Sequence, residues 1–462
     1  MAYAITASSQ ASKVEVTTNT LGNFELQRNG EPYYIKGAGA KDHFDLLVNS
    51  GANSIRIWST NNSALLDSAH KHGLTVALGL HVRPERSGMD YNNEYAVKGQ
   101  IEQLKNEVLK YKDHPALLDS AHQHGITVTL GLHVRPERSG MDYNNEYAVK
   151  GQIEYLKNEV LKYKDHPALL IWGIGNEVDL KYSNFKVWET IEVLAKFIKE
   201  VDPNHPTMTV IAGIDPSKAF YIKKYCPSID ILGLNVYGSI ENAGTNLRKF
   251  NWNKPYIVSE WGVNGPFEAR KTSWKAKIEL PNGLKANQRL RRYQELILKD
   301  KELCLGSYCF LWGQKQESTS TWHGMFLSNG KPTEAVDVMH FCWKGEWPQS
   351  RAPSIIDISL ENIGWKKDHI LAPSVTASLK IEYLKYNNKV IVEYVLYPEA
   401  FSDKIGGDIQ KSPEPINFEI IKQSDNELIF IIPKKKGAYR IFAFVKNEKG
   451  QSSVANIPFL VE

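Results

Sequence analysis

Residues 169–177 read Leu169-Leu-Ile-Trp-Gly-Ile-Gly-Asn-Glu177, a run of apolar and small residues that ends on a carboxylate. The apolar part predicts a buried strand over residues 169–175. A second run, Tyr256-Ile-Val-Ser-Glu260, has the same form. A carboxylate directly after buried residues is costly unless it is paired or used in chemistry. Two strands that each end on a glutamate therefore indicate a candidate site at the strand ends.

Strands and helices alternate along the chain on both sides of these runs. The predicted strands are 33–39, 53–58, 169–175, 206–213, 229–236, 255–260 and 304–312, and the helices between them include 44–49, 186–201, 217–225 and 288–298. Alternation of this kind predicts a parallel sheet. With one further strand from a repeated segment, the count is eight, which predicts an α/β fold, a (β/α)8 TIM barrel over residues 1–346. A doubly wound sheet is the alternative, but no Gly-x-Gly-x-x-Gly follows the first strand.

The alternation of strand and helix patterns ends near Trp347-Pro348. Seven short β-rich runs, separated by turn residues, lie between residues 355 and 462. This spacing predicts a C-terminal antiparallel β-sandwich of immunoglobulin or fibronectin III type over 355–462, as an accessory domain. We place the boundary near residues 346–354.

A tandem repeat occupies the first half of the predicted barrel. Residues 64–115 recur as 116–167, with four differences: Lys71/Gln123, Leu74/Ile126, Ala77/Thr129 and Gln103/Tyr155. Each copy predicts helix, strand, loop and helix. A barrel with a fixed number of strands has room for one such strand. We therefore expect one copy to supply the strand and the other, by preference the first, to be extruded. Whether the duplication is natural or engineered stays open.

Composition excludes several classes of protein. The 462 residues are 42% apolar and 23% charged, which is ordinary for a globular protein and not for a disordered or coiled-coil chain. A net charge of +4, from 56 basic and 52 acidic residues, is too balanced to indicate nucleic-acid binding. No apolar run is long enough to span a membrane. The four cysteines match no zinc pattern, and we expect neither metal nor cofactor.

The first residues of the chain carry no positive charge and too short an apolar run to match an intact signal peptide. The alternatives are a cytoplasmic protein or one whose signal has been removed. We favour a secreted or periplasmic protein.

The strand ends carry the polar residues expected of a barrel active site. They are Arg56, His81 or His133, Asn176, Glu177, Asn235, Tyr237, Glu260, Trp261 and Trp312. We expect the two glutamates to be catalytic and the other residues to bind substrate. Two carboxylates that face one pocket from different strands are what glycoside hydrolysis requires. Arg56 keeps its proton and can hold Glu260 ionised, and Tyr237 can donate to the same carboxylate. The other interpretation is that both glutamates belong to structural ion pairs.

With Asn-Glu after one strand, a single Glu after a later strand and Trp after the last, the sequence resembles the clan of retaining glycoside hydrolases that contains families 2 and 5. The resemblance covers most of residues 30–345. It implies that Glu177 is the acid–base residue and Glu260 the nucleophile. It further implies substrate-site roles for Arg56, for His81 or His133, and for Tyr237, with Trp312 as a stacking platform. One departure is Asn235, where many family 5 members have histidine.

The expected function is therefore that of a retaining β-glycoside hydrolase, which acts on a β-linked glycan of the β-glucan or β-galactan type without a cofactor. One alternative is a transglycosylase that uses the same residues. Another is a carbohydrate-binding protein without catalytic activity, since the duplicated segment lies near the predicted pocket. Sugar, linkage, endo or exo action and oligomeric state stay open.

Overall fold

The computed structural model describes residues 13–57, 68, 71–78, 128–132, 134–137, 140–165, 169–386, 389–402 and 410–462. The chain divides into two compact units, one made of 1–261 with 295–309 and the other of 262–294 with 310–462. Within the described residues, no helix is both long and apolar enough to cross a membrane. The first strand that belongs to a sheet of the C-terminal sandwich begins at Ser354. An independently folding domain over 355–462 stays a prediction.

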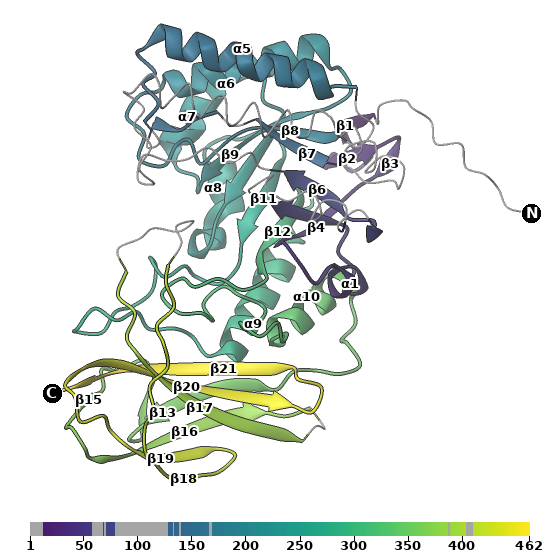
Figure 1. Cartoon of the computed structure of the whole chain (residues 1–462). Helices are drawn as coiled ribbons and strands as arrows, with labels where there is room; N and C mark the ends of the chain where they lie inside the picture. Colours follow the sequence, from purple (N-terminus) through teal and green to yellow (C-terminus); the bar gives the residue numbers. More distant parts are fainter. Residues whose placement is uncertain are drawn as a thin grey trace, which may run out of the picture. The chain divides into compact units, whose positions relative to one another are not determined.

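A closed barrel of parallel strands forms the body of the first unit (Figure 1). Its strands are β4 (Ile35–Ala40), β5 (Ser54–Ile57), β6 (Thr75–Leu78), β7 (Val128–Leu132), β8 (Leu169–Asn176), β9 (Thr207–Ala212), β10 (Ile231–Asn235), β11 (Tyr256–Trp261) and β12 (Cys304–Trp312). β8 is almost wholly buried, as its apolar sequence predicts. The prediction of a TIM-type barrel with a C-terminal β-sandwich is confirmed.

The number of strands differs from the prediction. The barrel has nine strands, because the first copy of the repeat supplies β6 and the second supplies β7. The expectation that one copy is extruded from the barrel is therefore wrong. A β-rich strand gains backbone hydrogen bonds and buried surface on entering a sheet, and the strands of the two copies differ here only at Ala77/Thr129.

The two copies pair in register with each other. Val76 lies opposite Val128, its own counterpart in the repeat, so the extra strand introduces no slip. On the outer sides, Val76 pairs with Ile55 and Val128 pairs with Leu169. The pairing with β5 has no register shift, whereas the pairing with β8 has one between Val128 and Thr129. One strand could satisfy both neighbours if it kept these two pairings.

We predict that a chain lacking residues 116–167 still folds, now as an eight-stranded barrel, because its single copy can pair with β5 and β8 in the present registers. Urea unfolding followed by circular dichroism should show one cooperative transition for the barrel, with a free energy of unfolding no lower than that of the full chain. Loss of the transition, or aggregation of the shortened chain, would show that the ninth strand is required.

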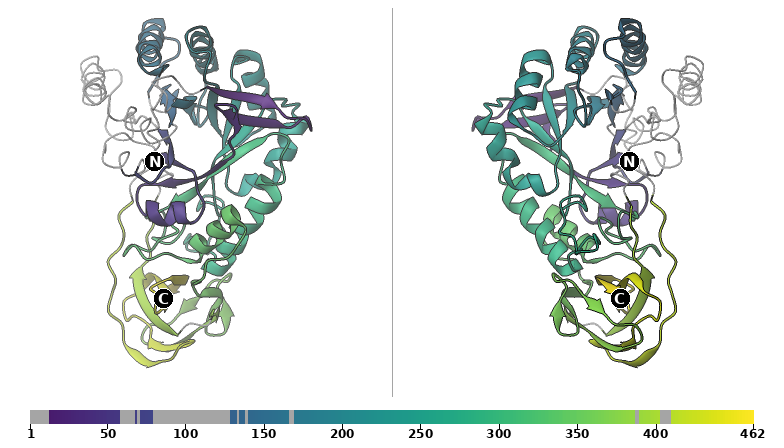
Figure 2. Two further views of the ribbon diagram at one scale, coloured as in Figure 1. Left: turned by 90° about the vertical axis from the view of Figure 1, so that its right-hand side faces the viewer. Right: turned by 90° about the vertical axis from the view of Figure 1, so that its left-hand side faces the viewer.

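The helices of the first unit lie on the outer side of its barrel strands (Figure 2). The helical elements are α1 (Phe44–Asn49), α5 (Glu146–Tyr163), α6 (Lys186–Val201), α7 (Pro216–Tyr225), η3 (Gly238–Asn242), α8 (Ala243–Lys249), α9 (Asn282–Arg291), η4 (Arg292–Ile297) and α10 (Glu334–Lys344). α1 and α6 have the predicted bounds. α9 begins six residues before the predicted start at 288, and the π-helical turn η4 takes the place of its predicted second half.

A three-stranded sheet at the N-terminus was not predicted. It consists of β1 (Val14–Thr18), β2 (Phe24–Arg28) and β3 (Glu31–Pro32). Val14 and Leu26 are buried in the same apolar cluster as Ile35, Leu170 and other barrel residues. The sheet therefore contributes to the barrel core.

The sandwich in the second unit has two sheets. One contains β13 (Ser354–Leu360), β14 (Ile363–Gly364), β16 (Thr376–Leu384), β18 (Ile420–Gln423) and β19 (Glu427–Ile431), and the other β15 (Ile370–Leu371), β17 (Val390–Pro398), β20 (Gly437–Asn447) and β21 (Ser452–Val461). Alternate residues of both sheets share one core, which includes Ile358 and Leu379 from the first sheet and Ile441 and Ile457 from the second. This is the packing that the alternating runs predict.

A buried carboxylate ties β21 to other parts of the second unit. Glu279 receives hydrogen bonds from Lys285 at 2.6 Å, Thr321 at 2.9 Å, Thr319 at 2.6 Å and, from β21, Asn456 at 2.7 Å. Both of its oxygens are thus fully used. Because a buried charge that loses its partner costs several kcal/mol, about 3–5, this cluster links the sandwich strongly to α9 and to the segment after β12.

Two other buried carboxyls in the second unit are not neutralised in this way. Burial raises the pKa of Glu334 to about 8 and that of Asp337 to about 7, although Arg351 lies nearby. Both are on α10. Each therefore holds its proton in the folded chain at a pH where the unfolded chain has lost it.

We predict that the stability of the second unit falls as pH rises from about 4.5 to about 8, because the folded state binds more protons than the unfolded state there. Glu334→Gln should remove much of this slope and raise the free energy of unfolding near pH 8 by about 1–3 kcal/mol, with little change near pH 4. Urea titrations at several pH values measure it. The exposed Glu346→Gln is the control, and equal slopes in both variants would contradict the prediction.

Candidate active site

Both glutamates singled out in the sequence follow a β-bulge. Between β8 and β9 the register shifts just before Asn176, and between β10 and β11 it shifts between Leu234 and Asn235, leaving Ser259 as the extra residue. A bulge adds one residue to a strand and redirects the side chains beside it. Each bulge therefore helps to bring consecutive polar side chains to the carboxyl end of the barrel.

Arg56, on β5, makes the central contacts of the site. Its guanidinium donates to Glu260 Oε1 at 2.8 Å, to the carbonyl oxygen of Ser259 at 2.7 Å, to Asn235 Oδ1 at 3.2 Å and to Asn176 Oδ1 at 2.7 Å. Only 10% of the Arg56 side chain and 13% of the Glu260 side chain are exposed. The ion pair between them is therefore largely shielded from water.

Tyr237 completes the surroundings of Glu260. Its hydroxyl donates to Glu260 Oε2 at 3.1 Å, so each carboxylate oxygen has one donor. The two donors, from β5 and from just beyond β10, fix the orientation of the carboxylate plane. The arrangement suits an oxygen nucleophile held in one orientation.

Glu177 lies just beyond β8 with a left-handed backbone, φ 49°. Non-glycine residues adopt this region at a cost, and such residues gather at functional sites. The strained residue is held by its backbone N–H, which donates to the carbonyl oxygen of Val210 at 2.8 Å. Its Oε1 accepts from Asn235 Nδ2 at 2.9 Å. Glu177 and Glu260 are therefore joined through Asn235 and Arg56.

The chain has recognisable relatives. Residues 117–268 match the sequence profile of the glycosyl hydrolases family 2 TIM barrel domain. The chain is 24% identical over 288 residues to a probable mannan endo-1,4-β-mannosidase F of Aspergillus flavus, covering 55% of this chain and 60% of that enzyme. With mannan endo-1,4-β-mannosidase F of Aspergillus clavatus it shares 21% identity over 281 residues, covering 53% and 61%.

Residues 117–268 are thus similar to a glycosyl hydrolases family 2 TIM barrel domain. Solved structures similar to the chain include a Bifidobacterium dentium β-glucuronidase (TM-score 0.45, 14% identity, covering 72% of this chain and 49% of that one). A Rhizomucor miehei family 5 mannosidase is also similar (TM-score 0.42, 12% identity, 71% and 96%). The chain spans less than two thirds of the length of the mannosidases named above. The family match begins in the second copy of the repeat.

Several residues of the predicted site do lie together: Arg56, Asn176, Glu177, Asn235, Tyr237 and Glu260. They come from β5, β8, β10 and β11 and from the residues that follow these strands. His81 and His133 are outside the described residues.

The two tryptophans of the predicted site are both buried. Trp261 and Trp312 have no exposed surface. Trp312 packs edge-on against Phe326, with ring centroids 5.4 Å apart, and beside Trp343. A ring needs an open face to stack on a sugar, and both rings are enclosed in this structure. The stacking platform at Trp312 and the substrate contact at Trp261 stay predictions. Apolar side chains at strand ends look alike in sequence whether they face a core or a pocket.

Sequence reasoning missed two supports of the site. Ser259 donates from Oγ to Asn235 Oδ1 at 2.7 Å. Asp179, two residues after Glu177, accepts from the backbone N–H of Ala212 at 3.1 Å and pairs with Lys218 at 2.6 Å. The signal for Asp179 was a second acidic residue close behind the first. The signal for Ser259 was absent, because a bulge leaves no mark in the residue pattern.

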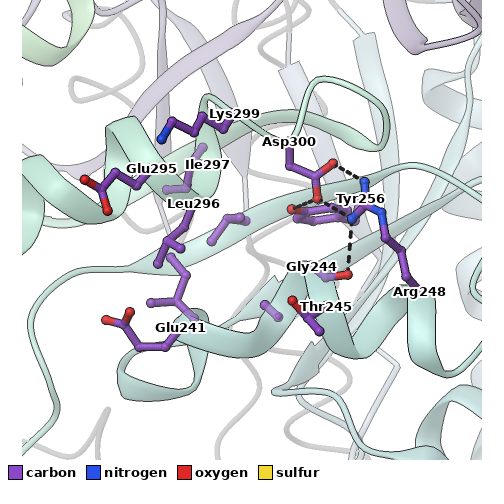
Figure 3. Close-up of a pocket in the computed structure, with 13 residues that line it drawn as sticks. Glu241, Gly244, Thr245, Arg248, Tyr256, Glu295, Leu296, Ile297, Lys299 and Asp300 are labelled. Atoms are coloured by element: carbon purple, nitrogen blue, oxygen red, sulfur yellow. Dashed lines mark hydrogen bonds and ion pairs between the residues drawn. The ribbon is translucent and has the colours of Figure 1, made fainter.

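A cavity of about 250 Å³ lies elsewhere on the first unit, between α8 and η4 (Figure 3). Charged side chains line it, but Arg248 and Asp300 are already bonded to each other at 2.8 Å. Neither Glu177 nor Glu260 is among its lining residues. It is therefore separate from the candidate active site. Across the described part of the chain, no cluster of three or more His, Cys, Asp or Glu side chains is placed to hold a metal ion.

We predict that Arg56→Met lowers the free energy of unfolding by about 3–5 kcal/mol, because it removes the cationic partner of the largely buried Glu260 carboxylate. Glu260→Gln removes the carboxylate charge. The double variant should therefore lose about 1–3 kcal/mol less in free energy of unfolding than the sum of the two single-variant losses. Urea unfolding of the two single variants and the double variant measures this. Arg248→Met, in a more exposed ion pair, should cost about 1 kcal/mol or less. Strict additivity of the two substitutions would contradict the assigned pairing.

Proposed function

We propose that this protein is a retaining β-glycosidase in which Glu260 is the nucleophile and Glu177 the acid–base residue. The observation that carries the proposal is the continuous set of contacts from Tyr237 through Glu260, Arg56 and Asn235 to Glu177. The contacts exist although two strands, β6 and β7, lie between β5 and β8. The ninth strand therefore does not interrupt the hydrogen bonds that join the residues of the candidate site.

The two glutamates have different surroundings, as this mechanism requires. Glu260 has a guanidinium and a hydroxyl on its oxygens, which suits attack on the anomeric carbon. As that bond forms, the glycosidic C–O bond breaks and Glu177 gives its proton to the leaving oxygen. Glu177 then takes a proton from water, whose oxygen attacks the same carbon and releases Glu260. The anomeric configuration is retained because two inversions occur.

A β-linked polysaccharide is the substrate class that we propose, with β-1,4-mannan as the first to test. Support comes from the relatives named as mannan endo-1,4-β-mannosidases. The β-glucan and β-galactan types expected from the sequence belong in the same panel. Such polymers are met outside the cytoplasm, which is consistent with a secreted or periplasmic protein.

We predict turnover of at least one β-linked oligosaccharide with retained configuration, followed by NMR of the newly formed anomeric proton. Glu260→Gln should reduce the rate to background, and Glu177→Gln should reduce it by about 10²–10⁴-fold. Glu295→Gln, on the exposed surface of η4, is the matched control and should keep the full rate.

Three other outcomes would change the assignment. Inverted products would overturn the assignment of Glu260 as nucleophile. Longer oligosaccharides among the products would show that a sugar, rather than water, intercepts the intermediate, as in a transglycosylase. Binding without turnover in both the unaltered protein and the variants would indicate a carbohydrate-binding protein without catalytic activity.

A further inference from the structure

Asn235 was expected to contact the sugar, yet its amide group is already fully used. Its oxygen accepts from Ser259 Oγ at 2.7 Å and from Arg56 Nη1 at 3.2 Å. Its nitrogen donates to Glu177 Oε1 at 2.9 Å and to Asn176 Oδ1 at 3.4 Å. A side-chain amide offers two donor hydrogens and two acceptor lone pairs. All four are occupied, and the residue is only 5% exposed.

The orientation of this amide follows from its neighbours. A guanidinium can only donate, so the amide atom that faces Arg56 is the oxygen. The nitrogen then faces Glu177. Rotating the amide by half a turn would set an N–H against the guanidinium and a carbonyl oxygen against the carboxyl group of Glu177.

Ser259 strengthens the same orientation from a protected position. It is 1% exposed, and it is the extra residue of the bulge between β10 and β11. Its hydroxyl makes the shorter of the two bonds to the Asn235 oxygen. The bulge therefore lets two successive residues act in the site: Glu260 as the proposed nucleophile and Ser259 on the amide.

We propose that Asn235, held by Ser259, is a positioning residue that orients Glu177 for proton transfer, and that it does not bind the sugar. This rests on the proposed function. An amide does not titrate in the physiological range, so Asn235 can hold Glu177 in place without adding a protonation step of its own.

The test compares Ser259→Ala and Asn235→Asp on two substrates of the same sugar. One is the oligosaccharide found in the NMR screen, and the other is its β-dinitrophenyl glycoside, whose leaving group departs without a proton. kcat/KM reports the first step for both. We expect each variant to lose at least about 10-fold in kcat/KM on the oligosaccharide, a fraction of the full effect of a general acid. KM should stay nearly constant, and kcat/KM on the dinitrophenyl glycoside should change by less than about 3-fold.

The pH profile provides a second readout. Asn235→Asp keeps the shape of the side chain and its acceptors for Arg56 and Ser259, but it replaces the donor to Glu177 by a carboxylate oxygen. A nearby negative charge favours the protonated form of a carboxyl group. The limb of the pH–rate profile that reports loss of the acid's proton should therefore move to higher pH in this variant.

The matched control is Ser307→Ala. Ser307 is also 1% exposed and lies on β12, opposite Val258 of β11. Its hydroxyl is buried and has no hydrogen-bond partner among the described residues. Both substrates should be turned over by this variant at the rate of the unaltered protein. If Ser307→Ala behaves as Ser259→Ala does, the effect is one of packing and the inference fails.

The remaining outcomes are distinct. Equal losses on the two substrates, or a large rise in KM, would overturn the positioning role and favour a contact with the sugar or with Glu260. No turnover of either substrate by the unaltered protein would overturn the proposed function, and the inference with it. Turnover by the unaltered protein with full activity in both variants would overturn the inference alone.

Discussion

The guanidinium of Arg56 reaches acceptors carried by β8, β10 and β11, although the residue itself lies on β5. It therefore fixes the relation between strands that are far apart in the sequence. An arginine can do this because its donors form a rigid planar fork and it stays charged when enclosed. Without it, the carboxylate of Glu260 would be enclosed without a compensating charge, and the amide of Asn235 would lose the contact that sets its orientation.

The barrel accommodates a ninth strand because the inserted unit is a copy of its own neighbour. Val76 and Val128 lie opposite each other, so corresponding side chains of the two copies point to the same face of the sheet. Strand pairing is sensitive to shifts of single residues, since a shift by one exchanges the two faces. A duplication of a whole α-β-α unit introduces no such shift. The described residues of the candidate site stay connected because they are carried by the other strands.

The bulges beside the two glutamates connect the fold to the proposed chemistry. Regular strands alternate their side chains, so successive residues point to opposite faces. At Ser259 and just before Asn176 that alternation is interrupted. The interruption allows Ser259 and Glu260, neighbours in the chain, to take part in one network of hydrogen bonds. The left-handed backbone of Glu177, just beyond β8, interrupts the alternation of side chains there in the same way.

The sequence by itself determined the class of fold, most strands, and the residues at the strand ends, because apolar runs and the glutamates that follow them are local features. It also identified Arg56 and Tyr237 as partners of Glu260. Tertiary structure alone decided the strand count, since a repeated strand can pair or be excluded depending on its neighbours. It also decided that Trp261 and Trp312 are buried and that Ser259 holds Asn235. Burial and bulges depend on what lies across the barrel, and residues distant in the chain determine both.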